Sequence, residues 1–225
     1  MLNTDKYKNS KGLLWLNVAS SFYVLEDFVN LDNHIFIRLM GFYKIATKII
    51  PKKYAGWLDS YHEAKQKAVL LRHDCRKPLP IHAQSVDHVL CSHFLEHVYP
   101  QECKNILNDF LKILKPGATL HIILPDIENL INQYLANKKN GMQRAADKFV
   151  KDSLLSKESR GSFKYRVLEF NGGFGLQHRW MYDNASISEL LKELGFEIIE
   201  KTETLPSYAF RLNDDSVHVV CKKRF

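Results

Sequence analysis

The sequence predicts an α/β fold in which helices cover both faces of a mainly parallel sheet. Three observations predict it. Short apolar and β-branched runs alternate with segments of helical spacing through most of the chain. Turn residues end several helices directly before the next apolar run. The length of 225 residues and the hydrophobic content of 45% suit a sizeable core, so we predict a single domain over 1–225.

The first two strands are predicted close together near the N-terminus. Residues 13–19 (LLWLNVA) form an apolar run that ends in small residues, and residues 28–32 (FVNLD) form a second run that ends in an acid. About eight residues separate the two runs, fewer than the dozen or so that a helical crossover requires. We therefore expect the usual first helix to be truncated or absent.

The next segment, 35–50, has the pattern of a basic amphipathic helix that ends at Pro51. Helical spacing places five apolar residues on one face: Ile35, Leu39, Phe42, Ala46 and Ile49. Such a face fits packing against the sheet, and it also fits an interfacial contact with a membrane or another partner. The sequence leaves this choice open.

The remaining elements follow in order along the chain. We predict helices over 57–67, 100–114 and 184–194, and strands over 68–72, 86–91, 118–124, 196–202 and 216–222. Lys115-Pro116-Gly117 should end one helix and Gly195 another. Residues 127–160 are mostly helical and charged, and a glycine-rich loop at 171–175 follows them. We predict a helical insertion or lid over about 127–178.

The composition limits the partners and the location. A net charge of +7 favours an anionic partner, such as a nucleotide cofactor, a phosphorylated lipid or a membrane surface. Nucleic acid is not favoured, because no arginine-rich or aromatic-interleaved basic run is present. The four cysteines include no C-x-x-C pair, which fits a reducing cytosol. No window approaches the roughly 18 apolar residues of a membrane span, so we expect a cytoplasmic protein.

The sequence predicts no metal site. His93 and His97 are four residues apart, which could place both on one helical face. However, neither an H-E-x-x-H motif nor a complementary set of carboxylates accompanies them.

Two motifs at a characteristic spacing carry a resemblance to a known family. VDHVLCSHFLEHV (86–98) and ILKPGATLHIILPD (113–126) together resemble the central signature of class I S-adenosylmethionine-dependent methyltransferases. HRWMYDNASISELLKELGFEIIE (178–200) is similar to the late helix and strand of that family. The most similar subgroup is the small bacterial methyltransferases associated with surface-polysaccharide biosynthesis. The resemblance implies a seven-stranded Rossmann-like sheet with an antiparallel last strand, and S-adenosylmethionine as cofactor.

The resemblance also implies where the cofactor would bind. It assigns Asp32 to the ribose hydroxyls, Asp74 and the backbone N–H of Cys75 to the adenine, and Ser92 and His93 to the methionine end. For Asp32 a surface acid is the less favoured alternative, whereas Asp74 could equally be a turn residue. The first loop has Ala19, Ser20 and Ser21 where the family has glycines. At a positive φ, an Ala or Ser in place of glycine costs about 1 kcal/mol.

Methyl transfer is an in-line displacement in which positioning does much of the work, helped by a base where the acceptor carries a proton. His178 is the preferred base, because histidine titrates near neutrality, and His93 and Asp126 are alternatives. His178 stands beside Arg179 and Trp180 and could instead simply pack. Asp126 precedes a helix, which is typical of an N-cap.

These observations lead to two main functional hypotheses. The first is a methyltransferase that acts on a small molecule, a glycan or a lipid-linked sugar. The second is a catalytically inactive relative that keeps the fold as a binding or scaffold protein, because its glycine loop is altered. A nucleic acid methyltransferase rests only on the positive charge. The sequence indicates neither the acceptor nor the oligomeric state.

Overall fold

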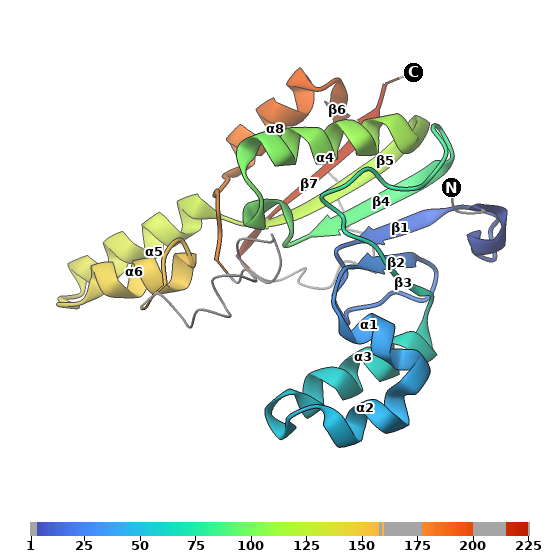
Figure 1. Ribbon diagram of the computed structural model, residues 1–225. Coiled ribbons are helices and arrows are strands. Elements are labelled where there is room, and N and C mark those ends of the chain that lie inside the picture. Colours follow the sequence, from blue (N-terminus) through green and yellow to red (C-terminus); the bar gives the residue numbers. More distant parts are fainter. Residues whose placement is uncertain (1–3, 158, 160–176, 200–214, 225) are drawn as a thin grey trace.

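The computed structural model describes residues 4–157, 159, 177–199 and 215–224. Within these residues, seven strands form one sheet in the order β3-β2-β1-β4-β5-β7-β6 (Figure 1). Strands β1 to β5 pair in parallel, and β7 runs antiparallel to both β5 and β6. The predicted sheet is therefore confirmed. The strands are β1 Trp15–Val18, β2 Val29–Asp32, β3 Leu70–Arg72, β4 Val86–Ser92, β5 Leu114–Pro125, β6 Phe196–Ile198 and β7 Ser216–Lys223.

Helices α4 (Pro100–Ile113) and α8 (Asn184–Glu193) cover one face of the sheet. Leu16, Val89 and Leu120 lie side by side in register on β1, β4 and β5, and each is fully buried. The apolar stripe of α4 packs on this row of side chains, since its residues recur at helical spacing. This layer is the main core of the protein.

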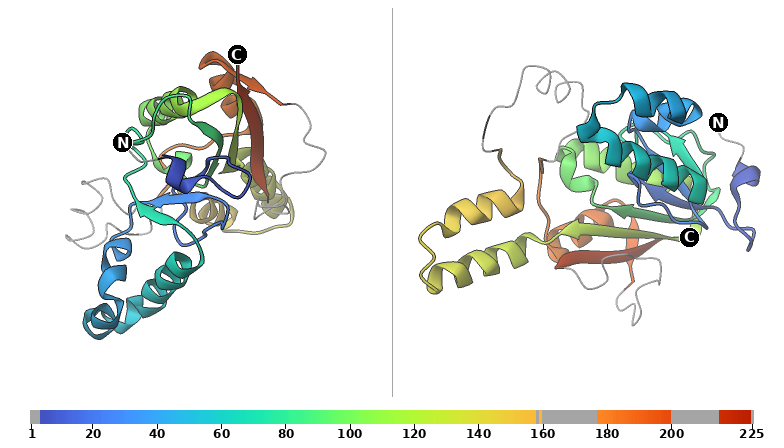
Figure 2. Two further views of the ribbon diagram at one scale, coloured as in Figure 1. Left: turned by 90° about the vertical axis from the view of Figure 1, so that its right-hand side faces the viewer. Right: turned by 90° about the horizontal axis from the view of Figure 1, so that it is seen from below.

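The opposite face of the sheet is covered near β2 and β3, where β3 is the edge strand. Helix α3 (Ala55–Lys67) packs Leu58 and Tyr61 against Leu70 of β3. Figures 1 and 2 show the α1–α3 group beside β2 and β3, on the side away from α4. No helix lies between β1 and β2, as the short spacing of these strands predicts. The prediction of helices on both faces is confirmed.

The single helix predicted over 35–50 is wrong in detail. The structure has α1 (Phe36–Leu39), a 3-10 turn η2 (Met40–Phe42) and α2 (Tyr43–Ile49). Because a 3-10 turn has about 3.0 residues per turn rather than 3.6, it shifts the phase of the helix that follows. Phe42 and Ile49 of the predicted apolar face are therefore 68% and 72% exposed, while Phe36, Ile37, Met40 and Ala46 are buried.

Helix α4 ends at Ile113, before Lys115-Pro116-Gly117, but these three residues lie within a strand and not in the predicted turn. Strand β5 starts at Leu114, directly after the helix. The pairing of β4 with β5 is irregular beside this segment, where the register shifts between Val86 and His88. Gly117 has φ 76° there, a conformation in which a side chain is disfavoured.

Two helices project away from the sheet in the predicted insertion (Figure 2). Helix α5 (Ile127–Lys139) and helix α6 (Ala145–Ser153) contact each other, and α5 has no buried residue. A lid role for this pair stays a prediction, and the glycine-rich loop at 171–175 lies outside the described residues. No helix in the described part of the chain is long and apolar enough to cross a membrane.

Candidate functional site

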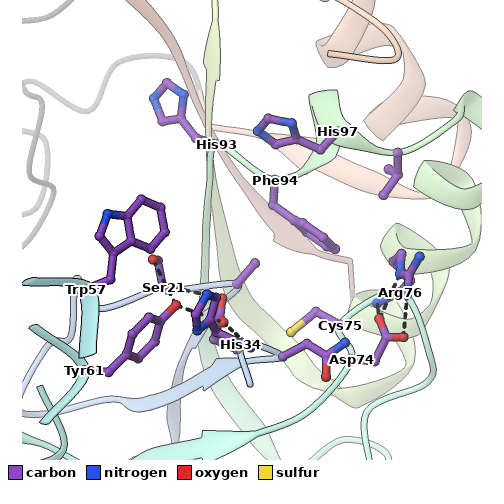
Figure 3. Close-up of a pocket in the computed structure, with 14 residues that line it drawn as sticks. Ser21, His34, Trp57, Tyr61, Asp74, Cys75, Arg76, His93, Phe94 and His97 are labelled. Carbon is purple, nitrogen blue, oxygen red and sulfur yellow. Dashed lines mark hydrogen bonds and ion pairs between the residues drawn. The ribbon is translucent and has the colours of Figure 1, made fainter. Parts of the chain in front are cut away.

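A pocket of about 320 Å³ lies where the carboxyl ends of the first four strands meet α3 (Figure 3). Ligands of open α/β sheets bind at this edge, because the loops that follow parallel strands converge there. The volume is within the range of small-molecule sites. The pocket is lined by Ala19, Ser21, Asp32, Asn33, His34, Trp57, Tyr61, Asp74, Cys75, Arg76, His93, Phe94, His97 and Val98.

The loop after β1 keeps a glycine-like backbone although it contains no glycine. Ala19 has φ 56° and Ser21 has φ 52°, so both lie in the left-handed region. Both residues line the pocket. Ser20 does not line it; this residue is buried, and its N–H donates to the Leu31 carbonyl over 3.0 Å. The expected need for positive φ in this loop is confirmed.

The Asp32 carboxylate is held by three donors at the end of β2. Its Oδ2 accepts the Ser21 N–H over 3.1 Å, and its Oδ1 accepts the His34 N–H over 2.7 Å and the Tyr61 hydroxyl over 3.3 Å. A carboxylate offers about four lone-pair directions. Asp32 is thus fixed in place and retains an acceptor direction for a ligand in the pocket.

Tyr61 belongs to this arrangement, although the sequence analysis did not select it. It is buried, its hydroxyl also lies 3.2 Å from Ser21 Oγ, and the His34 ring stacks on its ring at 4.6 Å. Burial, and then the nearby Asp32 carboxylate, raise the pKa of Tyr61 far above its ordinary value, so the phenol stays protonated as a donor. The sequence signal that could have indicated Tyr61 is its spacing of four residues from Trp57, which places both aromatic side chains on one face of α3.

Asp74 and Cys75 both line the pocket after β3, as the resemblance implied. Arg76 Nε and Nη2 donate to the two Asp74 carboxylate oxygens over 2.9 and 2.7 Å. This fork lowers the pKa of Asp74 and orients its carboxylate. Burial raises the pKa of the Cys75 thiol to about 12, so the side chain is a neutral part of the wall.

The opposite wall comes from the turn after β4. His93 has φ 50°, and it lines the pocket together with Phe94 and His97 (Figure 3). His93 Nδ1 is 3.3 Å from Glu96 Oε1, and its Nε2 is 3.5 Å from Ser216 Oγ. Ser92, the last residue of β4, does not line the pocket.

Comparisons with known proteins agree with this architecture. A family model described as a methyltransferase domain matches residues 48–122, about a third of the chain. No curated protein matches the sequence. A solved S-adenosylmethionine-dependent methyltransferase of Methanosarcina mazei superposes with a TM-score of 0.50 at 14% identity, covering 99% of this chain and 95% of its own. The chain has the class I methyltransferase fold.

Two further solved structures support the same fold. One chain of the complex that contains the Trm112 methyltransferase activator of Haloferax volcanii has a TM-score of 0.51 at 11% identity, and the match covers 94% of this chain and 83% of that one. A protein of Pyrococcus horikoshii OT3 has a TM-score of 0.50 at 18% identity, with coverages of 93% and 81%. At such identities the likeness describes the fold alone.

The three candidate bases occupy different places in this methyltransferase fold. His93 lines the pocket. His178 is buried and lies behind the pocket wall, with its ring 5.0 Å from the His97 ring. Burial is the main cause that lowers the pKa of His178. Asp126 accepts the Glu128 N–H over 2.9 Å as the N-cap of α5, which was the alternative reading of that residue.

We expect Ala19→Gly to raise the free energy of unfolding by up to about 1 kcal/mol, measured by urea denaturation. Glycine relieves the cost of a side chain at φ 56°. The matched control is Ala136→Gly, an exposed position in α5, where the same change should lower stability by about 1 kcal/mol. A loss of stability in both variants would contradict a strained loop.

Proposed function

We propose that this protein is an S-adenosylmethionine-dependent methyltransferase. The observation that carries the proposal is the Asp32 carboxylate, which three donors fix beside a loop of positive φ. A carboxylate in this position suits the two hydroxyls of a ribose, because it can accept hydrogen bonds from both. The fold and the matched methyltransferase domain support the same reading.

The chemical groups of the pocket residues suit this cofactor. Asp32 would hold the ribose, and the Asp74–Cys75 turn would meet the adenine. Ala19 and Ser21 would bring the backbone close to the methionine part, together with the turn after β4. When bound, the cofactor supplies a methyl group on a positively charged sulfur. Phe94 contributes an apolar side chain to the wall, and expulsion of water by a bound cofactor would strengthen the interactions that orient the reactants.

His93 is the residue that we assign to the acceptor proton. Among the three candidates it is the one that lines the pocket, and Glu96 lies against its Nδ1. A base must come within hydrogen-bond reach of the proton that it removes, so geometry favours His93 over the buried His178. We assign His178 to a positioning role behind His97.

The scaffold hypothesis is less well supported. It rested on the loss of glycine from the first loop, which would matter most if the loop had changed its shape. Ala19 and Ser21 instead keep the left-handed backbone, and the Ser21 N–H still bonds Asp32. The substitution therefore adds strain to the loop without removing the pocket.

Calorimetric titration with S-adenosylmethionine and S-adenosylhomocysteine tests the cofactor assignment. We expect binding to the unaltered protein and a loss of roughly 30-fold or more in Asp32→Ala, since a hydrogen bond to a charged group contributes about 1.5–3 kcal/mol. Asp27→Ala, an exposed acid outside the pocket, should bind like the unaltered protein. No binding at millimolar cofactor would favour the scaffold hypothesis instead.

The base assignment has its own test. With a glycan or small-molecule acceptor found by screening for S-adenosylhomocysteine release, His93→Gln should lower kcat by about 100-fold or more while cofactor affinity changes little. His82→Ala, at an exposed histidine away from the pocket, is the control. An unchanged kcat in His93→Gln would refute the assignment.

We further infer that the acceptor is a glycan carried on a lipid at a membrane surface. The support is a surface formed by the end of η2, α2, the 3-10 turn η3 (Lys52–Tyr54) and the start of α3, which we call the α2 surface. It exposes Phe42, Ile45, Ile49, Tyr54 and Trp57. Residues 34–58 include five basic residues and no acid. Apolar side chains with interspersed lysines suit an anionic bilayer surface.

The position of the α2 surface relative to the pocket strengthens this inference. Trp57 is 51% exposed on that surface and also lines the pocket (Figure 3). A membrane that contacts α2 would therefore lie beside the pocket. A lipid-linked acceptor could then reach the site with its lipid still in the bilayer.

Vesicle sedimentation tests the α2 surface. We expect the protein to bind vesicles that contain phosphatidylserine better than pure phosphatidylcholine vesicles, and less well at high salt. The variant Ile45→Glu/Ile49→Glu should lose at least about tenfold in binding. Leu135→Glu, an equally exposed apolar position on α5, is the control. Equal sedimentation of both variants would contradict the inference, and concentration-dependent dimers lost only in the α2 variant would assign the surface to self-association.

A further inference from the structure

A buried carboxylate lies among histidines behind the wall of the pocket. Glu96, in the 3-10 turn η4 (Leu95–His97), is 1% exposed. Its Oε1 lies 3.3 Å from His93 Nδ1 and 3.8 Å from His97 Nε2. In the described part of the chain, neither carboxylate oxygen has a hydrogen-bond partner. Because a carboxyl group that is buried without hydrogen bonds is costly, a cation bound beside Glu96 and its neighbouring histidines would stabilise this arrangement.

His178 brings a second unpartnered buried atom to the same place. Its Nδ1 also lacks a hydrogen-bond partner among the described residues. One ligand atom each from Glu96, His97 and His178 lies within 4.8 Å of the other two. Ions bound at 2.0–2.2 Å hold their ligand atoms about 3.3 Å apart, so small side-chain rotations would bring the three to one ion.

The surrounding contacts orient these side chains as metal ligands are usually oriented. His97 Nδ1 faces the Gln177 carbonyl at 3.3 Å and its Nε2 faces Glu96, so Nε2 is the ring atom directed at the proposed site while Nδ1 is held from outside it. The N–H groups of Arg179 and Trp180 donate to the Glu96 carbonyl over 2.6 and 3.2 Å. These bonds fix the segment that contains His178 against η4.

We propose that Glu96, His97 and His178 bind a divalent transition metal ion. Two imidazoles and one carboxylate suit Zn²⁺, Mn²⁺ or Fe²⁺, whereas Mg²⁺ and Ca²⁺ prefer oxygen ligands. His97 also lines the pocket, so the ion would lie next to the pocket. No metal site was predicted from the sequence, because no complementary set of ligands accompanies His93 and His97 there. The fold supplies the third ligand, His178, from far along the chain. Metal binding here does not depend on methyl transfer.

The test uses the full-length protein, stripped with a chelator and titrated with Zn²⁺ and with Co²⁺ in the absence of cofactor. We expect saturation at about one ion per chain, a visible Co²⁺ spectrum typical of mixed nitrogen and oxygen ligands, and a higher melting temperature. His178→Ala should weaken binding by more than about 100-fold, because even loss of an outer partner costs 10–100-fold. His82→Ala, at an exposed histidine outside the cluster, should bind as tightly as the unaltered protein.

Glu96→Gln separates a ligand role from a purely structural one. It keeps the size of the side chain and removes the charge, so the metal-free variant should melt at a higher temperature than the unaltered protein and lose the rise produced by Zn²⁺. The proposal is overturned if the unaltered protein shows no saturable Zn²⁺ or Co²⁺ binding. It is also overturned if the two variants bind these ions as tightly as the His82→Ala control, or if Mg²⁺ binds as tightly as Zn²⁺.

Discussion

The hydrogen bonds to the Asp32 carboxylate tie together the parts that make the pocket. Through the Ser21 N–H they connect the end of β2 to the loop after β1, and through the Tyr61 hydroxyl they connect it to α3. The His34 N–H fixes the turn that leads into α1. An ionised acceptor forms stronger hydrogen bonds than a neutral one, and partial burial protects them from competition by water. One side chain thus both shapes the pocket and presents a charge to it.

The same loop stands where a first crossover helix is usual. In many parallel sheets the crossover helix after β1 directs its N-terminal N–H groups at a ligand. Here the chain passes from β1 to β2 through a short loop, and Ala19 and Ser21 accept a left-handed backbone to complete it. The strain of about 1 kcal/mol at such a residue is small beside the net stability of a domain. A domain of this size can therefore keep the loop in a ligand-ready shape without glycine.

The pocket lies between two regions of the protein that differ in chemistry. On the α3 side, Trp57 connects it to exposed apolar and basic residues. On the β4 side, His93 and His97 connect it to the buried Glu96 carboxylate. A ligand in the pocket would thus lie between a surface suited to an anionic membrane and a cluster suited to a cation. Both features come from segments that flank the residues proposed to bind the cofactor, and in a shared fold specificity resides in such flanking segments.

The sequence by itself determined the strands, most helices and the cofactor edge. Apolar runs and their spacing depend on local burial, so β1, β2, α4 and α8 were predictable, as was the position of Asp32 at a strand end. It did not determine the phase of the segment 35–50, because a 3-10 turn shifted that phase and exposed Phe42. Only tertiary structure could bring Tyr61 to Asp32, or His178 to Glu96. Contacts between residues far apart in the chain depend on how helices and strands pack. The hydrophobic periodicity of the sequence predicts these elements but does not specify their packing.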